Sequence, residues 1–406
     1  MILNTTIAVG LLVLLVVLYL FHYRRNFRKI TTYNLEGVKK LVPPGFNFTR
    51  IRVETDDGYI LSLFNLRHKS NYTPAKRPVL FHHGLGNSGA NWLMGGAHNS
   101  AACNLAKQGH DIYLGNARGN VYCLEHKWLD KNSKEFWDYS FQDMRYDIKA
   151  FMEHIHNKTG KLIHYISHSQ GSVAMLAALA DVDRDIAEAI DSKLHTFYCF
   201  SPVVYTKKTR MVAFKVGKVG IEPLKKFMDR LGIYGMTGAP EKVNTWKMET
   251  INSMKKINKK LAFSWVDRTN KFNNTDLFGT FNAFHPHGMS FQTIHHFMQI
   301  HKLGGRKYFK KFDYGPEVNM KKYGSAEPPS YDFGLVTARV KLYYGDQDRY
   351  LDPSDMEMLI EDLCNADLEV NMMKDYGHVS FTLGTNNYNF YQNLIDESGR
   401  TEQVSR

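Results

Sequence analysis

The sequence predicts an α/β protein with a mostly parallel sheet, one helical insertion and a membrane segment at the N-terminus. Apolar, β-prone runs alternate with longer helical stretches along most of the 406 residues, which is typical of a parallel sheet covered by helices on both faces. This alternation is interrupted once, over residues 202–300, where no clear strand is found. With 43% apolar and 23% charged residues, the chain can bury a full core, which excludes a disordered or low-complexity protein.

The first 23 residues carry no charged side chain, and residues 7–21 form an unbroken apolar run. No basic residue precedes the run and no small-residue cleavage site follows it, so we expect an uncleaved single-pass helix rather than a removed signal peptide. Basic residues lie on its C-terminal side (Arg24, Arg25, Arg28 and Lys29), so the positive-inside rule predicts a domain facing the cytoplasm or its topological equivalent. Glycosylation at the N-x-[ST] sequons of the chain would instead indicate that the domain lies on the opposite side of the membrane. The sequence does not distinguish an endoplasmic reticulum, lipid droplet or mitochondrial membrane.

Strands are expected wherever short β-prone runs end in turn residues. The runs 51–54 and 59–64 flank the turn-forming residues Asp56-Asp57-Gly58, and this pattern predicts a β-hairpin. Six further runs predict the parallel strands: 79–82, 112–114, 162–166, 197–200, 340–344 and 368–372. The expected organisation is an anchor over 1–23, a basic connector over 24–45, an α/β core over 46–201 and 301–398, a helical insertion over 202–300 and a polar tail over 399–406.

The formal net charge is +12, and much of the excess lies over residues 202–276, with 16 Lys and Arg against 6 Asp and Glu. Either an anionic lipid surface or plain solvation fits this charge. The lysines concerned are Lys207, Lys208, Lys225, Lys226, Lys255, Lys256, Lys259 and Lys260. No nucleic-acid partner is expected, because no binding motif accompanies the charge. Four scattered cysteines and a His-rich stretch over 285–301 without carboxylates at ligand spacing predict neither a disulfide framework nor a metal site.

The segment Ser167-His168-Ser169-Gln170-Gly171 carries the strongest chemical signal. It follows the expected strand 162–166 and leads into a helix-like run over 173–179. A serine on a sharp strand-to-helix turn presents its hydroxyl away from the backbone, and the helix N-terminus favours developing negative charge. Ser169 is therefore the candidate nucleophile, although Ser167 stands where the usual pattern has glycine. An ordinary Ser-rich connection is the alternative.

Two possible partners of Ser169 follow later strands. Asp348 comes just after the expected strand 340–344, and His378 follows the strand that begins at Leu368. Serine, acid and histidine in this order are typical of α/β-hydrolases, with histidine as the base and the acid orienting it. The choice of acid stays open, because Asp346 and Asp352 lie close by.

The loop after the strand 79–82 supplies the fourth element. Its sequence His82-His83-Gly84-Leu85-Gly86-Asn87 predicts an oxyanion hole made by the backbone N–H groups of Leu85 and Gln170. Residues 84–89 also match G-x-G-x-x-G, a dinucleotide-binding pattern. That pattern wants an acidic residue at the end of the next strand, whereas Asp111 begins that strand. No cofactor is therefore expected.

Together these residues resemble the acid lipase family, which comprises gastric and lysosomal acid lipases and membrane-anchored steryl ester hydrolases. The matching stretches are Glu54 to Leu61, His83-Gly84-Leu85, Asn91-Trp92, Gly115 to Asn120, Phe136 to Ser140, His168 to Gly171, Gly345 to Asp348, Asp352 and His378. The resemblance implies Ser169, Asp348 and His378 as catalytic residues and Leu85 and Gln170 as oxyanion donors.

The resemblance further implies that the insertion is a cap with a movable lid over an acyl-binding crevice, and that the substrates are neutral lipid esters, steryl esters or acylglycerols. The sequence departs from the pattern at Ser167 and in lacking the cap cysteine pair of secreted members, which fits a cytoplasmic enzyme. The alternative function is an inactive lipase-fold subunit that acts as a scaffold in a membrane complex. Arg118 is expected to be a buried structural partner of a carboxylate rather than a catalytic group.

Overall fold

The computed structural model describes residues 35–209, 225–237, 262–303 and 305–395. The expected anchor over 1–23 and tail over 399–406 lie outside these ranges, as do the lysines of the insertion between 255 and 260. Within the described ranges, no helix combines the length and apolar character needed to cross a bilayer.

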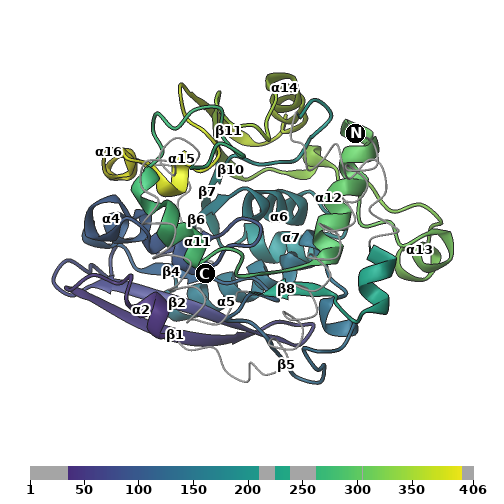
Figure 1. The fold of residues 1–406 in the computed structure, drawn as a ribbon, viewed down its shortest axis with the longest axis horizontal. Helices are drawn as coiled ribbons and strands as arrows, with labels where there is room; N and C mark the ends of the chain where they lie inside the picture. Colours follow the sequence, from purple (N-terminus) through teal and green to yellow (C-terminus); the bar gives the residue numbers. More distant parts are fainter. Residues whose placement is uncertain (1–34, 210–224, 238–261, 304, 396–406) are drawn as a thin grey trace, which may run out of the picture.

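A nine-stranded sheet forms the centre of the molecule, with the strand order β1-β2-β4-β3-β6-β7-β10-β11 and β5 beside β2 (Figure 1). The pairs of β2 with β1, β4 and β5 are antiparallel, and the remaining neighbours are parallel. The strands are β1 (Phe46–Glu54), β2 (Tyr59–His68), β3 (Val79–His82), β4 (Ile112–Gly115), β5 (Glu125–His126), β6 (Ile163–His168), β7 (Leu194–Phe200), β10 (Arg339–Gly345) and β11 (Asp367–Met373). All eight strands expected from the sequence are present, including the β1–β2 hairpin, and within this sheet only the two-residue β5 was missed.

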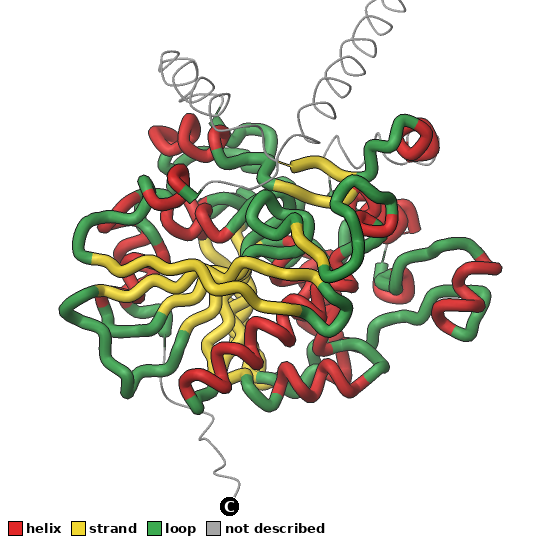
Figure 2. Tube along the Cα trace, turned by 90° about the horizontal axis from the view of Figure 1, so that it is seen from below, coloured by secondary structure: helices red, strands yellow, loops and turns green. Residues whose placement is uncertain are grey.

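Helices cover the sheet on both sides (Figures 1 and 2). One group packs α4 against α3 and α16, and the other packs α5, α6 and α7 together across β6. The α-helices are α2 (Glu36–Lys39), α3 (Gly96–Asn99), α4 (Ala101–Lys107), α5 (Met144–Thr159), α6 (Gln170–Leu179), α7 (Arg184–Asp191), α11 (Phe278–Ala283), α12 (Phe291–Leu303), α13 (Pro316–Tyr323), α14 (Pro353–Asp362), α15 (Ser380–Leu383) and α16 (Asn387–Gln392). Single 3₁₀ turns lie at η1 (Gly89–Leu93), η2 (Glu135–Trp137), η3 (Phe141–Asp143), η4 (Thr275–Leu277), η5 (Arg306–Tyr308) and η6 (Phe333–Leu335).

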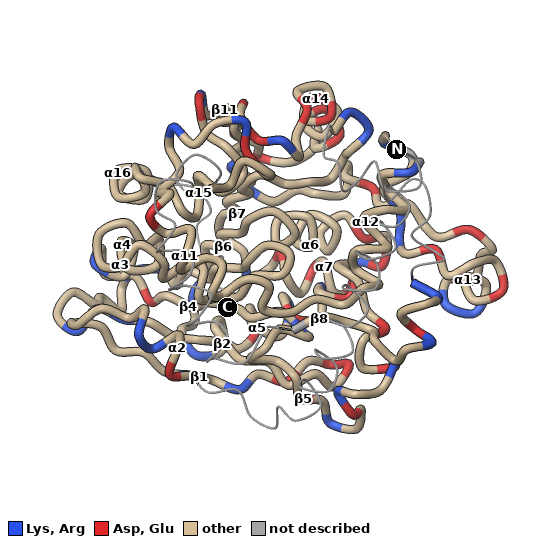
Figure 3. Tube along the Cα trace, viewed as in Figure 1, with Lys and Arg blue, Asp and Glu red and all other residues tan. Residues whose placement is uncertain are grey.

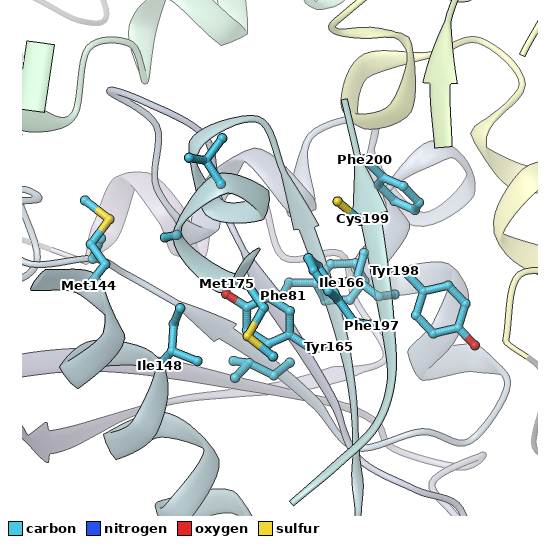
Figure 4. Close-up of a cluster of buried hydrophobic side chains, with 14 of the residues drawn as sticks. Phe81, Met144, Ile148, Tyr165, Ile166, Met175, Phe197, Tyr198, Cys199 and Phe200 are labelled. Atoms are coloured by element: carbon cyan, nitrogen blue, oxygen red, sulfur yellow. The ribbon is translucent and has the colours of Figure 1, made fainter. Parts of the chain in front are cut away.

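The core is centred on β6, β7 and α6, in which every residue is buried. Strands buried on both faces favour apolar and uncharged residues at successive positions, which explains why β6 and β7 show no alternation of apolar and charged residues. Figure 4 shows Tyr165 and Ile166 of β6 beside Phe197 and Tyr198 of β7. Charged residues of both signs lie instead on the outer elements, as Figure 3 shows. A core of this kind holds the ends of its strands in fixed positions.

The chain leaves the sheet after β7 and returns only at β10, which begins at Arg339. Within this excursion, β8 (Gly235–Thr237) and β9 (Gly288–Ser290) pair as a small antiparallel sheet. The expectation that residues 202–300 contain no strand was therefore wrong. Strands of three residues, paired across about fifty positions, are too short for a periodic pattern. The domain boundaries at 202 and 300 stay a prediction, although the excursion from the sheet extends beyond residue 300.

Arg118 lies buried between two carboxylates, as expected. Its Nη1 is 2.6 Å from Asp57 Oδ2 and its Nε is 2.8 Å from Asp147 Oδ1. The guanidinium also stacks over the ring of Tyr59, 4.2 Å from its centroid. Burial raises the pKa of Asp147 to about 6, against the charge and hydrogen bonds of Arg118, which act to lower it.

We expect Arg118→Met to lower the free energy of unfolding by about 3–5 kcal/mol, because it leaves a buried carboxylate without its partner. Urea denaturation followed by circular dichroism would measure the loss. Arg52→Met is the matched control, because Arg52 pairs with Glu125 at the surface with its side chain 54% exposed. Such an exposed pair contributes at most about 1 kcal/mol. Equal losses in the two variants would contradict a structural role for Arg118.

Candidate active site

Ser169 occupies the sharp turn between β6 and α6. Its φ of 54° and ψ of −119° are rare for a residue with a side chain, and such strain persists only where the surrounding structure holds it. The backbone N–H of Ser169 donates to the carbonyl oxygen of Phe200 at 2.9 Å, which ties the turn to the end of β7. Ser169 at this turn lines a cavity.

The residues on either side of this turn are closely packed. A Cβ atom on Gly171 would lie 2.8 Å from the carbonyl oxygen of His83, so glycine is required there. Ser167, which replaces the usual glycine, is fully buried, and its hydroxyl lies 2.9 Å from that of Ser172. The Ser172 hydroxyl in turn donates to the carbonyl of Phe200 at 3.1 Å. The departure at Ser167 is therefore accommodated by a buried hydrogen-bonded pair.

The structure brings Ser169, His378 and Asp348 together. His378 Nε2 lies 2.9 Å from Ser169 Oγ, and His378 Nδ1 lies 2.7 Å from Asp348 Oδ2. Asp348 is fully buried, and its second oxygen accepts the backbone N–H of Tyr350 at 2.8 Å. The three residues follow β6, β10 and β11, whose carboxyl ends meet at one edge of the sheet.

The other two candidate acids point elsewhere. Asp346 is exposed, and its carboxylate accepts the backbone N–H of Asp375 at 2.7 Å. Asp352 caps α14 by accepting the backbone N–H of Ser354 at 3.1 Å. Asp348 is thus the one of the three carboxylates that contacts His378.

The surroundings of His378 favour its charged form. Burial lowers the pKa of the imidazole, but the charge and hydrogen bond of Asp348 and the charge of Asp267 outweigh burial and raise that pKa above its usual value. In the neutral ring, the Nδ1–H that donates to Asp348 leaves Nε2 free to accept the proton of Ser169. The arrangement therefore suits a base that must become an imidazolium during the reaction.

Leu85 and Gln170, the expected oxyanion donors, line the same cavity as Ser169 and His378. Gln170 is the first residue of α6, so its backbone N–H has no acceptor within the helix. Leu85 follows β3, and its neighbour Gly84 lies so near the nucleophile that an added Cβ would be 3.1 Å from Cβ of Ser169. The two N–H groups thus come from the loop after β3 and from the first turn of α6, whose residues line the cavity around Ser169.

The cavity has a volume of about 200 Å³ and a largely apolar wall. Much of this wall comes from the excursion between β7 and β10, namely Val203, Trp265, Val266, Phe281, Met289 and Phe297. Trp265 lines the cavity while its side chain is 48% exposed. An apolar substrate group beside Ser169 would contact these side chains.

The rival dinucleotide pattern lacks its structural context. The loop over 84–89 leads into the 3₁₀ turn η1 rather than an α-helix whose N-terminus could take a pyrophosphate. The carboxylate of Asp111 is bonded to Arg67 and Asn65 at the start of β4. In the part of the chain that the structure describes, no cluster of three or more His, Cys, Asp or Glu side chains is arranged to hold a metal.

One residue of the site was missed. Asp267 is 1% exposed, and its carboxylate accepts the backbone N–H of His378. It lies in a segment without helical or strand periodicity, and 111 residues separate it from His378. No sequence signal pointed to it, because the contact exists only in the folded chain.

The sheet, the turn at Ser169 and the three converging side chains define an α/β-hydrolase with the site of a serine hydrolase. Residues 42–96 match the partial alpha/beta-hydrolase lipase region, and residues 77–192 match the alpha/beta hydrolase fold. The chain is 33% identical to lipase lipl-1 of Caenorhabditis elegans, over 85% of this chain and 86% of that protein. It is 31% identical to gastric triacylglycerol lipase of Rattus norvegicus, over 83% and 84% of the two chains.

The chain therefore belongs to the acid lipase family, and it is a lipase or carboxylic ester hydrolase. A solved structure of a soluble variant of monoglyceride lipase from Saccharomyces cerevisiae shares the fold, with a TM-score of 0.52 and 16% identity over 90% of this chain and 94% of that one.

Proposed function

We propose that this protein is a membrane-anchored serine hydrolase that cleaves neutral lipid esters, either steryl esters or acylglycerols, through an acyl-enzyme on Ser169. The observation that carries the proposal is the continuous hydrogen-bonded path from the Ser169 hydroxyl through His378 to Asp348, at distances of 2.9 and 2.7 Å. This path opens into an apolar cavity.

In the proposed reaction, Ser169 Oγ attacks the ester carbonyl carbon while His378 Nε2 takes its proton. Asp348 stabilises the imidazolium, and the N–H groups of Leu85 and Gln170 hold the oxyanion. The bond to the leaving alcohol then breaks as His378 protonates its oxygen. Water repeats the sequence on the acyl-enzyme, releasing the fatty acid and restoring Ser169.

The choice of substrate rests on the cavity wall and on the relatives. Phe281, Met289 and Phe297 present apolar surface beside Ser169, where an acyl chain would bind more readily than a charged group. The similar rat protein is named a gastric triacylglycerol lipase. These observations favour hydrophobic esters without separating acylglycerols from steryl esters.

The membrane part of the proposal rests on the sequence of the first 29 residues. An uncharged, largely apolar stretch of 23 residues followed by four basic residues favours an anchor with the catalytic domain on the cytoplasmic side. Extraction of the full chain by detergent but not by alkaline carbonate supports the anchor. Release by carbonate contradicts it.

The activity is tested by labelling the full chain, in detergent, with a fluorophosphonate probe. We expect covalent labelling that is absent from Ser169→Ala and present in Ser192→Ala, a surface control whose hydroxyl bonds the carbonyl of Ala189 at 3.2 Å. Folded protein that is never labelled would favour the inactive scaffold. Parallel assays on a long-chain steryl ester and a triacylglycerol then identify the substrate class.

A further inference from the structure

We propose that Asp267, from the excursion between β7 and β10, is a positioning residue that holds the His378 loop and tunes its pH response. The inference rests on the function proposed above, because it assigns Asp267 a role through His378. The two carboxylates, Asp348 and Asp267, would then divide the task. Asp348 bonds the ring of His378, and Asp267 bonds its backbone.

The segment that carries Asp267 is fastened to the loop that carries Asp348. The backbone N–H of Arg268 donates to the carbonyl of Gln347 at 2.8 Å, and that of Arg349 donates to the carbonyl of Val266 at 2.9 Å. Arg349 Nε also donates to the Asp267 carbonyl at 3.0 Å. The backbone of Asp267 is thus fixed beside the site from two directions.

The Asp267 side chain reaches from there to the backbone of the His378 loop. It accepts the backbone N–H of His378, and its second oxygen accepts Asn273 Nδ2 at 2.7 Å. The amide oxygen of Asn273 accepts the hydroxyl of Ser380 at 2.6 Å, and that hydroxyl accepts the backbone N–H of Gly377 at 2.8 Å. A connected set of buried hydrogen bonds therefore holds the loop that carries His378.

Gly377 shows how closely the loop and the carboxylate approach. A Cβ atom at this position would lie 2.2 Å from Cγ of Asp267. Only glycine lets the loop rest on the Asp267 side chain. The position of His378 along the line from Asp348 to Ser169 therefore depends on this contact.

Asp267 also acts on His378 through charge. Burial and then the charge of Asp348 raise the pKa of Asp267 to about 7, against the opposing effects of His378 and Asn273. An ionised Asp267 favours the imidazolium form of His378 and so contributes to raising the pKa of that ring. Four other polar or charged groups lie nearby: Tyr350, Arg268, Arg349 and His168. The centroid of the Tyr350 ring is 4.6 Å from that of His378. Burial and the charge of His378 lower the pKa of His168 well below its usual value.

Two substitutions separate geometry from charge. Asp267→Ala removes both the acceptor and the charge, whereas Asp267→Asn keeps an oxygen that can accept the N–H of His378. We expect Asp267→Ala to lower kcat by about 10–100-fold, the scale of a small misplacement of a catalytic group. KM should change little, because Asp267 does not line the cavity. Asp267→Asn should lose less kcat.

Both variants should move the acid limb of kcat/KM to lower pH. Without the charge of Asp267 the imidazolium is less stabilised, so the pKa of His378 falls and the neutral base persists at lower pH. Asp346→Asn is the matched control, because Asp346 is an exposed carboxylate that also accepts a backbone N–H, that of Asp375. It should keep the wild-type kcat and pH profile.

The measurements use the full chain in detergent, with thermal unfolding recorded for each variant. If Asp267→Ala does not fold, Asn273→Ala decides instead, since it removes the donor that orients Asp267 and should lower kcat with KM unchanged. Suppose that the wild-type protein is labelled by fluorophosphonate but the folded Asp267 variants keep the wild-type kcat and the wild-type acid limb of kcat/KM. This result would overturn the inference about Asp267 and leave the proposed function standing. A wild-type protein that is not labelled would overturn both the inference and the proposed function.

Discussion

Replacing Ser169 with alanine is expected to lower kcat for ester hydrolysis by roughly 10⁶-fold, the scale seen when a serine nucleophile is removed. The alanine side chain cannot form the acyl-enzyme, and the remaining oxyanion donors can assist only direct attack by water. His378→Ala should lose about as much, because the hydroxyl of Ser169 would then have no base within 2.9 Å. The double variant should be no worse than either single one, since the two residues act as a unit.

The measurement is steady-state hydrolysis of a chromogenic long-chain ester by the full chain in detergent micelles. Ser192→Ala serves as the control for the loss of a serine hydroxyl remote from the site. If Ser169→Ala kept more than about 1% of the wild-type kcat, its loss would be no larger than the loss of about 10²–10³-fold caused by removing a single oxyanion donor. Such a small loss would point to another nucleophile.

The parts of the fold that sequence predicted are those whose environment constrains every residue. β6 and β7 are buried at all positions, so their residues are uniformly apolar or uncharged and the runs are visible without an alignment. Ser169, Asp348 and His378 were predicted for a related reason. Each follows such a strand, and the carboxyl ends of parallel strands meet at one edge.

The features that escaped prediction depend on contacts between distant segments. β8 and β9 have three residues each and pair only after the excursion from the sheet has folded back. For the acid, the residues alone left Asp346, Asp348 and Asp352 open, because all three lie within seven positions of the chain, and only the resemblance favoured Asp348. In the structure, the buried Asp348 carboxylate is the one of the three that contacts His378.

Asp348→Asn is the variant that tests this assignment of the acid, and we expect it to lower kcat by about 10⁴-fold. An asparagine fits the fully buried position and can still accept the N–H of Tyr350. Its amide would then donate to Nδ1 of His378, which places the ring hydrogen on Nε2. A protonated Nε2 cannot accept the proton of Ser169, so the geometry survives while the base is lost.

The same assay on Asp346→Asn should give nearly wild-type turnover, because that carboxylate faces solvent and bonds Asp375 rather than His378. A large loss in Asp346→Asn with a small one in Asp348→Asn would reverse the assignment. For the residual activity of Asp348→Asn, the acid limb of the kcat/KM profile should lie at lower pH than in the wild type. The charge of Asp348, which raises the pKa of His378, is absent from this variant. Comparison with Asp267→Asn then ranks the two carboxylates. A far larger loss at 348 than at 267 is expected, because one bonds the reacting ring and the other only its backbone.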